Sequence, residues 1–375
     1  MIMYEIDSGV EKILQSVGTT KEGISIIKQK AYIHKIYIKD IKTGAANILK
    51  QDALSVGADV GVSEACVFCG EEYTDAILLA TPAQLKKLVK KEKLQPFGLR
   101  NLSIYMNELL KAKTYENKIM GVINANDDSF FDSSRLKGDD AVKKINTMIQ
   151  EGANIIDIGA VSSAPNSKLV NEDEELLRIK PIIDEIYKQK LYEKAELSVD
   201  SYSPKVVKYT LDRGFKIVND ITGLKNDEIA RLASEYKAKV VIMHMQNNPS
   251  NMQDNPEYKD AVNDVSEFFK SRLAKANEFG IKDVILDVGI GFGKTLEHNI
   301  SLIKSLAHFR SFGCELLIGG SRKSMIDKIV SCKPEDRLPG TLSLHIKALE
   351  NGANILRVHD VKEHYQALKV YESLK

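Results

Sequence analysis

Short apolar runs alternate with longer amphipathic segments along the last two thirds of the chain. Each run has four to six residues, is rich in Ile, Val and Leu, and shows no strict alternation with polar residues. This pattern is typical of strands buried on both faces, as in a parallel sheet. The predicted strands span Ile119–Ile123, Asn154–Gly159, Glu196–Asp200, Lys216–Asp220, Lys239–His244, Asp283–Asp287, Glu315–Gly319 and Asn354–Val358.

Helical patterns fill the intervals between these runs. Ser203 and Pro204 are typical of an N-cap and a first helical turn, and Gly152 and Gly280 suit helix ends in a left-handed conformation. Eight strand–helix pairs in about 250 residues match the usual length of a (β/α)8 barrel. We therefore expect an α/β fold with a TIM barrel over 118–375, and a doubly wound open sheet is the alternative. The predicted helices span 138–151, 171–190, 203–213, 226–237, 258–279, 297–309, 337–351 and 361–373.

The preceding segment has a less regular pattern, which predicts a small separate α/β domain over 1–115 whose role the sequence does not indicate. Cys66 and Cys69 have the spacing of half a zinc site, but no second pair or nearby His accompanies them, so we expect buried thiols. The lysine-rich stretch 86–91 predicts a solvated helix face. Predicted strands span Ala31–Ile38, Ala58–Val62 and Ala76–Ala80, and predicted helices span Val10–Val17, Thr43–Leu54 and Pro82–Lys93.

Charge and composition narrow the class of protein. The 375 residues include 53 Lys and Arg and 52 Asp and Glu, for a net charge of +1. This balance argues against a basic surface along the whole chain that would bind nucleic acid. No apolar stretch is long enough to predict a membrane span. With 4 Cys and no secretory signal pattern, the expected location is a reducing cytoplasm.

Polar side chains stand at the end of nearly every predicted strand. In a barrel these ends converge on one mouth, where active sites lie. A polar residue can also simply mark where a strand leaves the core, but that explanation is weak for eight strands in succession. The residues concerned are Asn124, Asp157, Asp200, Asn219 with Asp220, His244, Asp287, the triplet 321–323, and Arg357 with His359.

Two carboxylates and an amide in such a mouth need partners, because buried charge is costly without them. A ligand with several N–H donors in one plane, such as the aminopyrimidinone ring of a pterin or guanine, satisfies Asp200, Asn219 and Asp287. Internal pairing of the acids with Lys323 or Arg357 is the alternative.

The loops after the predicted strands suggest further chemistry. The glycine-rich segment 289–295 lacks the spacing of a P-loop, so we expect a sharp turn below a flat ligand, with Phe292 available to stack. The segments 321–324 and 357–360 follow strands seven and eight. The loops after these two strands form the usual phosphate-binding site of this barrel, and a surface basic cluster is the alternative. Asn124 can bind Mg²⁺, and the acidic loop 126–132 after it can close as a lid or remain a solvated loop.

Taken in order, these motifs resemble dihydropteroate synthase over roughly 118–375. The resemblance rests on many separate motifs, of which any one alone is weak. They are the Met120-Gly121 start with Asn124 and 128–130, Ser198-Val199-Asp200, Asn219-Asp220-Ile221, Met243-His244-Met245, Asp287 with Gly291-Phe292-Gly293-Lys294, Ser321-Arg322-Lys323-Ser324, and Arg357-Val358-His359-Asp360.

This family joins 6-hydroxymethyl-7,8-dihydropterin diphosphate to 4-aminobenzoate, releases pyrophosphate, and forms homodimers; sulfonamides mimic its 4-aminobenzoate. The resemblance implies Mg²⁺ on Asn124. The charge balance and the lack of a long apolar stretch predict no nucleic-acid partner and no membrane partner. The resemblance implies catalytic roles for Lys323, Arg357 and Asp128. It further implies that the substrates are bound by Ser163, Asp200, Asn219, Met243, Asp287, Phe292, Lys323, Ser324, Arg357 and His359.

The chain departs from the family pattern in two loops. Ala164 stands where the family has an Arg, and Asn126-Asp127 replaces Thr-Pro. Arg135 is a candidate for supplying the missing charge. Two other functions therefore stay open: a pterin-binding methyltransferase barrel with a corrinoid partner, and a non-catalytic pterin-binding protein.

Overall fold

A computed structural model describes residues 1–6, 8–125, 134–161, 170–247 and 251–374, without the side chains of 134–137. The chain divides into two compact units, one over Met1–Ala112 and the other over Lys113–Arg310 and Cys314–Leu374. Each unit has its own sheet.

The second unit is a closed parallel barrel with the strand order β10-β11-β4-β5-β6-β7-β8-β9. The predicted α/β barrel is therefore confirmed, and each predicted strand is present with small differences at its ends. The strands are β4 (Lys118–Asn124), β5 (Ile155–Gly159), β6 (Glu196–Asp200), β7 (Ile217–Asp220), β8 (Lys239–Met243), β9 (Val284–Asp287), β10 (Glu315–Ile318) and β11 (Ile355–Val358).

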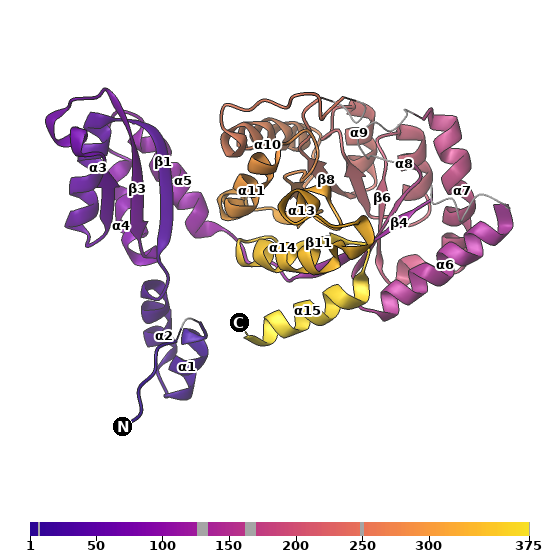
Figure 1. The fold of residues 1–375 in the computed structure, drawn as a ribbon, viewed down its shortest axis with the longest axis horizontal. Helices are drawn as coiled ribbons and strands as arrows, with labels where there is room; N and C mark the ends of the chain where they lie inside the picture. The colour runs from indigo at the N-terminus through magenta and orange to yellow at the C-terminus, as the bar shows by residue number, and fades with distance from the viewer. Residues whose placement is uncertain (7, 126–133, 162–169, 248–250, 375) are drawn as a thin grey trace. The chain divides into compact units, whose positions relative to one another are not determined.

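Helices follow the barrel strands and surround them (Figure 1). Ser203 caps its helix by accepting a hydrogen bond from Val206 N, and Gly152 and Gly280 have φ of 105° and 76°, as predicted. No helix among the described residues is long and apolar enough to cross a membrane. The helices are α6 (Ser134–Gln150), α7 (Glu172–Lys188), α8 (Pro204–Leu211), α9 (Asp227–Glu235), α10 (Ala261–Glu278), α11 (Leu296–Lys304), α12 (Leu306–Phe309), α13 (Ser324–Ile329), α14 (Leu338–Glu350) and α15 (Val361–Leu374).

Two predictions for these helices were wrong, and one helix was not predicted. The helix expected from 258 begins at Ala261, because Asp260 is its N-cap and accepts from Val262 N and Asn263 N. The helix expected over 297–309 is two helices that meet at Ser305. Helix α13 was not predicted, since its six residues are too few to show a helical period.

One layer of inward-facing apolar side chains fills the barrel below its mouth. These side chains are almost fully buried and come from seven of the eight strands, which makes the barrel a packed core rather than a pore. They lie one or more pleats below the polar residues that end the strands. The layer consists of Met120, Ile155, Ile217, Val241, Ile285, Leu317 and Ile355.

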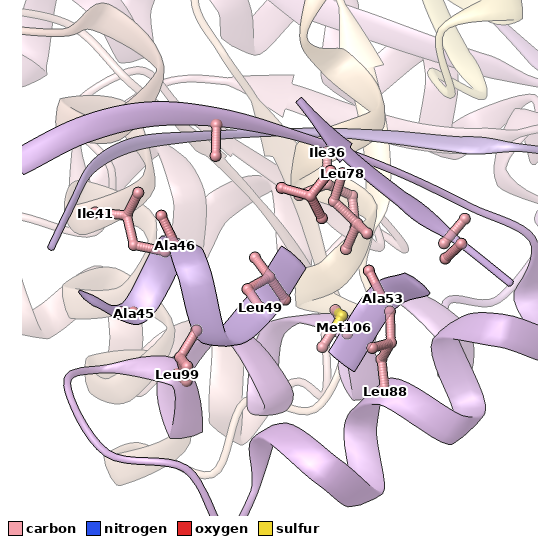
Figure 2. Packing of buried hydrophobic residues seen from close by; sticks show 14 of the residues in the cluster. Ile36, Ile41, Ala45, Ala46, Leu49, Ala53, Leu78, Leu88, Leu99 and Met106 are labelled. Carbon is pink, nitrogen blue, oxygen red and sulfur yellow. The ribbon is translucent and has the colours of Figure 1, made fainter. Parts of the chain in front are cut away.

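The first unit contains an antiparallel sheet with the order β1-β3-β2, from β1 (His34–Lys42), β2 (Asp59–Val62) and β3 (Tyr73–Ala80). Strand β3 alternates exposed and buried residues, so one face of the sheet packs on helices. Leu49, Leu78 and Met106 are fully buried in this core (Figure 2). The helices are α1 (Val10–Ser16), α2 (Lys21–Ile27), α3 (Thr43–Ser55), α4 (Pro82–Glu92) and α5 (Leu99–Lys111).

Several predictions for this unit were also wrong. Helices α2 and α5 were not predicted, and β1 begins and ends later than the expected Ala31–Ile38. A register shift between Ile38 and Ile41 interrupts the alternation in β1, which hid the second half of the strand. Of the two thiols expected to be buried, Cys66 is buried but Cys69 is exposed.

Candidate active site

The polar residues that end the barrel strands lie at one mouth, because all eight strands are parallel. Asn124, Asp200 and Asp287 are the last residues of β4, β6 and β9, and Met243 ends β8. Asn219 and Asp220 close β7, and Arg357 lies in β11. The barrel thus brings together residues that are far apart in the sequence.

Arg357 connects two carboxylates across this mouth. Its Nε donates to Asp157 Oδ2 at 2.7 Å, and its Nη2 donates to Asp200 Oδ2 at 2.6 Å. Asn219 Nδ2 donates to the same Asp157 oxygen at 3.0 Å. Internal pairing, the alternative left open by the sequence, is therefore realised for Asp200. Because its amide nitrogen is used, Asn219 presents its amide oxygen as an acceptor.

Burial shifts the ionisation of these groups. It raises the pKa of Asp200 and of Asp287, while Arg357 opposes the rise at both. The carboxylates in turn keep the pKa of Arg357 above its ordinary value, so the guanidinium stays charged. Asp287 also accepts a hydrogen bond from Gly289 N at 2.8 Å, which stabilises its anionic form.

Lys323 lies on the loop that follows β10, directly before α13. Its Nζ is 4.2 Å from the centre of the Phe292 ring, so this ring stacks on a cation. Gly291 has φ of 81°, and a Cβ there would come within 3.3 Å of Lys323 Cδ, which explains the glycine. Burial, reinforced by Arg357, lowers the pKa of Lys323 to about 8.

An apolar cluster borders the same mouth. Met243 and Phe292 pack with Ile221 and Met252, and each of these side chains is at least nine-tenths buried. The sequence predicts that Met243 and Phe292 of this cluster contact a planar ring.

Lys294 is a buried cation that sequence reasoning treated only as part of a motif. Its Nζ donates to the carbonyl oxygens of His244, Gly289 and Phe292 at 3.2, 3.0 and 2.9 Å, and lies 3.0 Å from His244 Nδ1. Burial lowers the pKa of Lys294 to about 7, and these four acceptors favour the charged form. The side chain ties the glycine-rich loop to the end of β8.

The loops after β10 and β11 are also joined. Ser321 Oγ accepts from His359 N at 3.3 Å and lies 2.9 Å from His359 Nδ1, and Arg322 donates twice to the Asp360 carboxylate. Burial, reinforced by Arg357, lowers the pKa of His359 to about 4. His359 is therefore a neutral imidazole near pH 7 and offers one N–H rather than a charge.

Some predicted residues are not placed in this arrangement. Asp128, Ser163 and Ala164 lie outside the described residues, as does the side chain of Arg135. Ser324 is exposed, at the first position of α13 beside Lys323.

Two further strand-end residues are satisfied within the protein. Asp220 accepts from Thr222 N, Thr222 Oγ1 and Leu224 N, so it holds the loop after β7 rather than facing a ligand. Burial, with the Lys294 charge beside it, lowers the pKa of His244 to about 3.

Asp157 belongs to the network around Arg357, although no binding role was predicted for it from the sequence. It is fully buried, and its Oδ1, together with Ser198 Oγ on the neighbouring strand, has no hydrogen-bond partner among the described residues. Two such atoms in register are expected to bind a water or a polar ligand. Asp157 had appeared among the strand-end residues, and a buried acid inside the run Ile155–Gly159 was the signal that could have identified it.

No group of three or more His, Cys, Asp or Glu side chains able to hold a metal occurs in the part of the chain that the structure describes. Mg²⁺ commonly binds through only one or two protein oxygens together with substrate phosphates. The amide oxygen of Asn124, a hard donor at the mouth, is compatible with that mode.

Comparison with known proteins places this geometry in a family. Residues 120–359 match the model of the pterin binding enzymes. A bifunctional dihydropteroate synthase/dihydropteroate reductase of Helicobacter pylori is 39% identical over 98% of this chain and 97% of its own length. Dihydropteroate synthase structures from Yersinia pestis with a sulfonamide and from Thermus thermophilus with 4-aminobenzoate are 34% and 33% identical, with TM-scores of 0.64 and 0.63.

Each of these structures covers 69% of this chain and 94% or 95% of its own, which corresponds to one barrel. The Helicobacter relative, by contrast, matches the first unit as well. The motifs, the closed barrel and the polar mouth agree with these matches, and the chain belongs to the dihydropteroate synthase family of pterin-binding enzymes.

Proposed function

We propose that this protein is a dihydropteroate synthase of folate biosynthesis, joining 6-hydroxymethyl-7,8-dihydropterin diphosphate to 4-aminobenzoate with release of pyrophosphate. The observation that supports this most is the network in which Arg357 joins Asp157 and Asp200 beside Asn219. It combines acceptors for a pterin with cations for a diphosphate at one mouth. The relatives named above support the same activity.

The pterin ring is assigned to the acidic side of the mouth. Asp200, Asp287 and the amide oxygen of Asn219 accept hydrogen bonds from the ring N–H and the exocyclic amino group. Met243 and Phe292 supply the apolar wall against which the ring packs. Lys323, held over Phe292, donates to a ring nitrogen or carbonyl.

The diphosphate is assigned to the loops after β10 and β11. Arg357 has N–H groups left after binding the two carboxylates, and a guanidinium fork suits phosphate oxygens. His359 contributes one N–H, and Ser321 holds that imidazole in place. Ser324, Ser163 and Asp128 are proposed contacts on the family pattern alone.

The reaction breaks the bond between the pterin methylene carbon and the diphosphate oxygen, whose electron pair leaves with pyrophosphate. The developing cation on the dihydropterin is stabilised by Asp200 and Asp287, and the departing anion by the Arg357 guanidinium and the His359 N–H. The amine lone pair of 4-aminobenzoate then forms the carbon–nitrogen bond, and the resulting ammonium releases a proton to solvent. Since an arylamine is already unprotonated near pH 7, the protein needs only to position it.

Mg²⁺ fits this scheme through Asn124, whose amide oxygen would hold the ion. When bound, the ion supplies positive charge to the diphosphate.

A pyrophosphate-release assay tests the proposal. Wild-type protein with the pterin diphosphate, Mg²⁺ and 4-aminobenzoate is expected to release pyrophosphate, whereas Lys323→Ala and Asp200→Ala are expected to release far less. If the wild type releases no more than these variants, the protein is not a synthase. Pterin-dependent methyl transfer to a corrinoid, or pterin binding without turnover, would then identify one of the alternative functions.

The match to the Helicobacter protein supports a second candidate activity. That relative is named a dihydropteroate reductase as well as a synthase, and the similarity extends over the first unit. We propose that the full chain also reduces dihydropteroate with a reduced nicotinamide or flavin as hydride donor. Oxidation of such a donor that depends on dihydropteroate, and that Lys323→Ala retains, would support this reductase activity. If no donor is oxidised, the reductase activity is contradicted.

The homodimer implied by the family resemblance and the cytoplasmic location indicated by the cysteine content remain predictions. Light scattering of the purified protein tests the first, with an expected mass of twice 41.8 kDa.

A further inference from the structure

Two buried histidines connect the loops after β10 and β11, to which the diphosphate is assigned, although neither histidine is a proposed substrate contact. His345 lies in α14 and His364 in α15, and they are 0% and 1% exposed. Gly320 N donates to His345 Nε2 at 3.1 Å, His345 Nδ1 lies 2.9 Å from His364 Nε2, and His364 Nδ1 lies 2.6 Å from the Asp360 carbonyl oxygen.

The two end partners fix where the protons lie. Because Gly320 N–H is a donor, His345 Nε2 accepts, and a neutral His345 has its proton on Nδ1. That proton is donated to His364 Nε2, which leaves the His364 proton on Nδ1, facing the carbonyl oxygen of Asp360. Every donor has an acceptor only when both rings are neutral. Burial lowers the pKa of both imidazoles and so maintains this state.

The chain of hydrogen bonds joins two loops that follow different strands. Gly320 precedes Ser321, which holds His359, and Asp360 follows His359. The loops are joined a second time by the partly buried Arg322–Asp360 ion pair.

The backbone at the start of the first loop depends on this contact. A Cβ at Gly320 would come within 2.6 Å of Leu344 Cδ2 and 3.1 Å of His345 Nε2, so the loop is pressed against α14. Arg322 has φ of 54°, a left-handed conformation that is unfavourable for a side chain larger than glycine. Its N–H donates to Thr341 Oγ1, one turn before His345 in the same helix. Helix α14 thus holds the backbone of this loop at two positions, Gly320 and Arg322.

We propose that His345 and His364 act as one unit that positions the loops after β10 and β11 for the diphosphate end of the substrate. They are positioning residues, since they touch the loops and not the substrate. This inference rests on the proposed function, because it assumes that these loops bind the diphosphate.

The test separates the two ends of the substrate. His345→Phe and His364→Phe keep a buried ring but break the chain of hydrogen bonds between the two loops. Each variant is expected to raise the dissociation constant of inorganic pyrophosphate and the KM of the pterin diphosphate about tenfold. This is the effect of one lost buried hydrogen bond. The affinity for 6-hydroxymethylpterin, which lacks the diphosphate, is expected to stay within a factor of about two of wild type. Calorimetry measures both affinities.

Two further variants distinguish positioning from general damage. His345→Gln retains an acceptor and a donor and is expected to recover most of the loss. The double variant is expected to bind pyrophosphate as tightly as the more impaired of the two single variants, because the effects of residues that act as a unit are not additive. His308→Phe, a change to a histidine in α12 that bonds Ser266, is the matched control and should leave both affinities unchanged.

The outcomes are distinct. Equal loss of pyrophosphate and pterin affinity, additive single effects, or unchanged pyrophosphate affinity in variants that melt like wild type would overturn the positioning role alone. Wild-type protein that neither binds pyrophosphate nor turns over would overturn the proposed function, and this inference with it.

Discussion

Arg357 Nε lies 2.7 Å from Asp157 Oδ2, in a contact between β11 and β5 that spans the barrel wall through β4. Asp157 has no exposed surface, and the guanidinium that pairs with it also pairs with Asp200. The contact fixes the guanidinium in place before a substrate arrives, so a fork of N–H groups is already oriented for an anion.

Replacing Arg357 tests this arrangement. In Arg357→Lys the ammonium cannot reproduce two directed bonds, so kcat/KM for the pterin diphosphate is expected to fall about a hundredfold. Arg357→Ala leaves buried acids unpaired and is expected to lower the free energy of unfolding by about 3–5 kcal/mol. Kinetics and urea unfolding measure the two effects. Arg213→Lys, at an ion pair with Asp184, is the control, and equal effects there would contradict the account.

Asp287→Asn tests the role of negative charge beside the pterin. The amide oxygen can still accept from Gly289 N, so the loop is expected to remain in place. The variant lacks the anion that stabilises the developing cation, and kcat is expected to fall about a hundredfold. Single-turnover kinetics check this, with Asp227→Asn on the surface as a control. A variant that loses only substrate affinity would show that the charge binds but does not stabilise the transition state.

The pH dependence reports on Lys323, whose pKa is lowered to about 8 by burial. The side chain is cationic below that pH and neutral above it, so kcat/KM is expected to decline above about pH 8 as the charge is lost. An arginine stays charged throughout this range, and Lys323→Arg is expected to lack the alkaline decline even if its activity is lower. An identical decline in both proteins would assign it to another group.

Lys294→Met removes the donor to the carbonyl oxygens of His244, Gly289 and Phe292. Without it the glycine-rich loop loses its link to the end of β8, and KM for the pterin diphosphate is expected to rise about tenfold. KM for 4-aminobenzoate is expected to change less. Steady-state kinetics measure both constants, and Lys270→Met on the exposed side of α10 is the control. A normal KM in a folded Lys294→Met protein would contradict the loop's dependence on this cation.

Arg135 is the candidate replacement for the family arginine absent at Ala164, and its side chain lies outside the described residues. Arg135→Ala is expected to weaken diphosphate binding about tenfold or more, as expected for a lost charge-assisted contact. Lys143→Ala, later in the same helix, is the control. An unchanged KM for the pterin diphosphate would reject the replacement.

The local sequence was sufficient to predict the barrel and most of the residues at its mouth. Doubly buried runs such as Ile155–Gly159 predict parallel strands, and the end of a parallel strand predicts where Asp200 and Asp287 lie. The pairing of side chains was harder to predict, since Arg357 and Asp157 are 200 residues apart and only the closed barrel brings them together. The sequence therefore left open whether Asp200 pairs within the protein.

Irregular geometry accounts for the remaining errors. The register shift after Ile38 and the left-handed residue Asp40 break the period of β1, so its second half did not read as a strand. Lys294 resembles any lysine after a glycine turn, and its burial arises only when the loop folds back on His244. Neither feature leaves a periodic signal in the sequence.

The central claim is that one mouth binds the pterin and expels its diphosphate. The most direct measurement is the stoichiometry of pyrophosphate and dihydropteroate formed by wild-type protein from the pterin diphosphate and 4-aminobenzoate. Equal amounts of the two products, with both lost in Arg357→Ala, are predicted. Pyrophosphate without dihydropteroate, or equal product from the variant, would contradict the account.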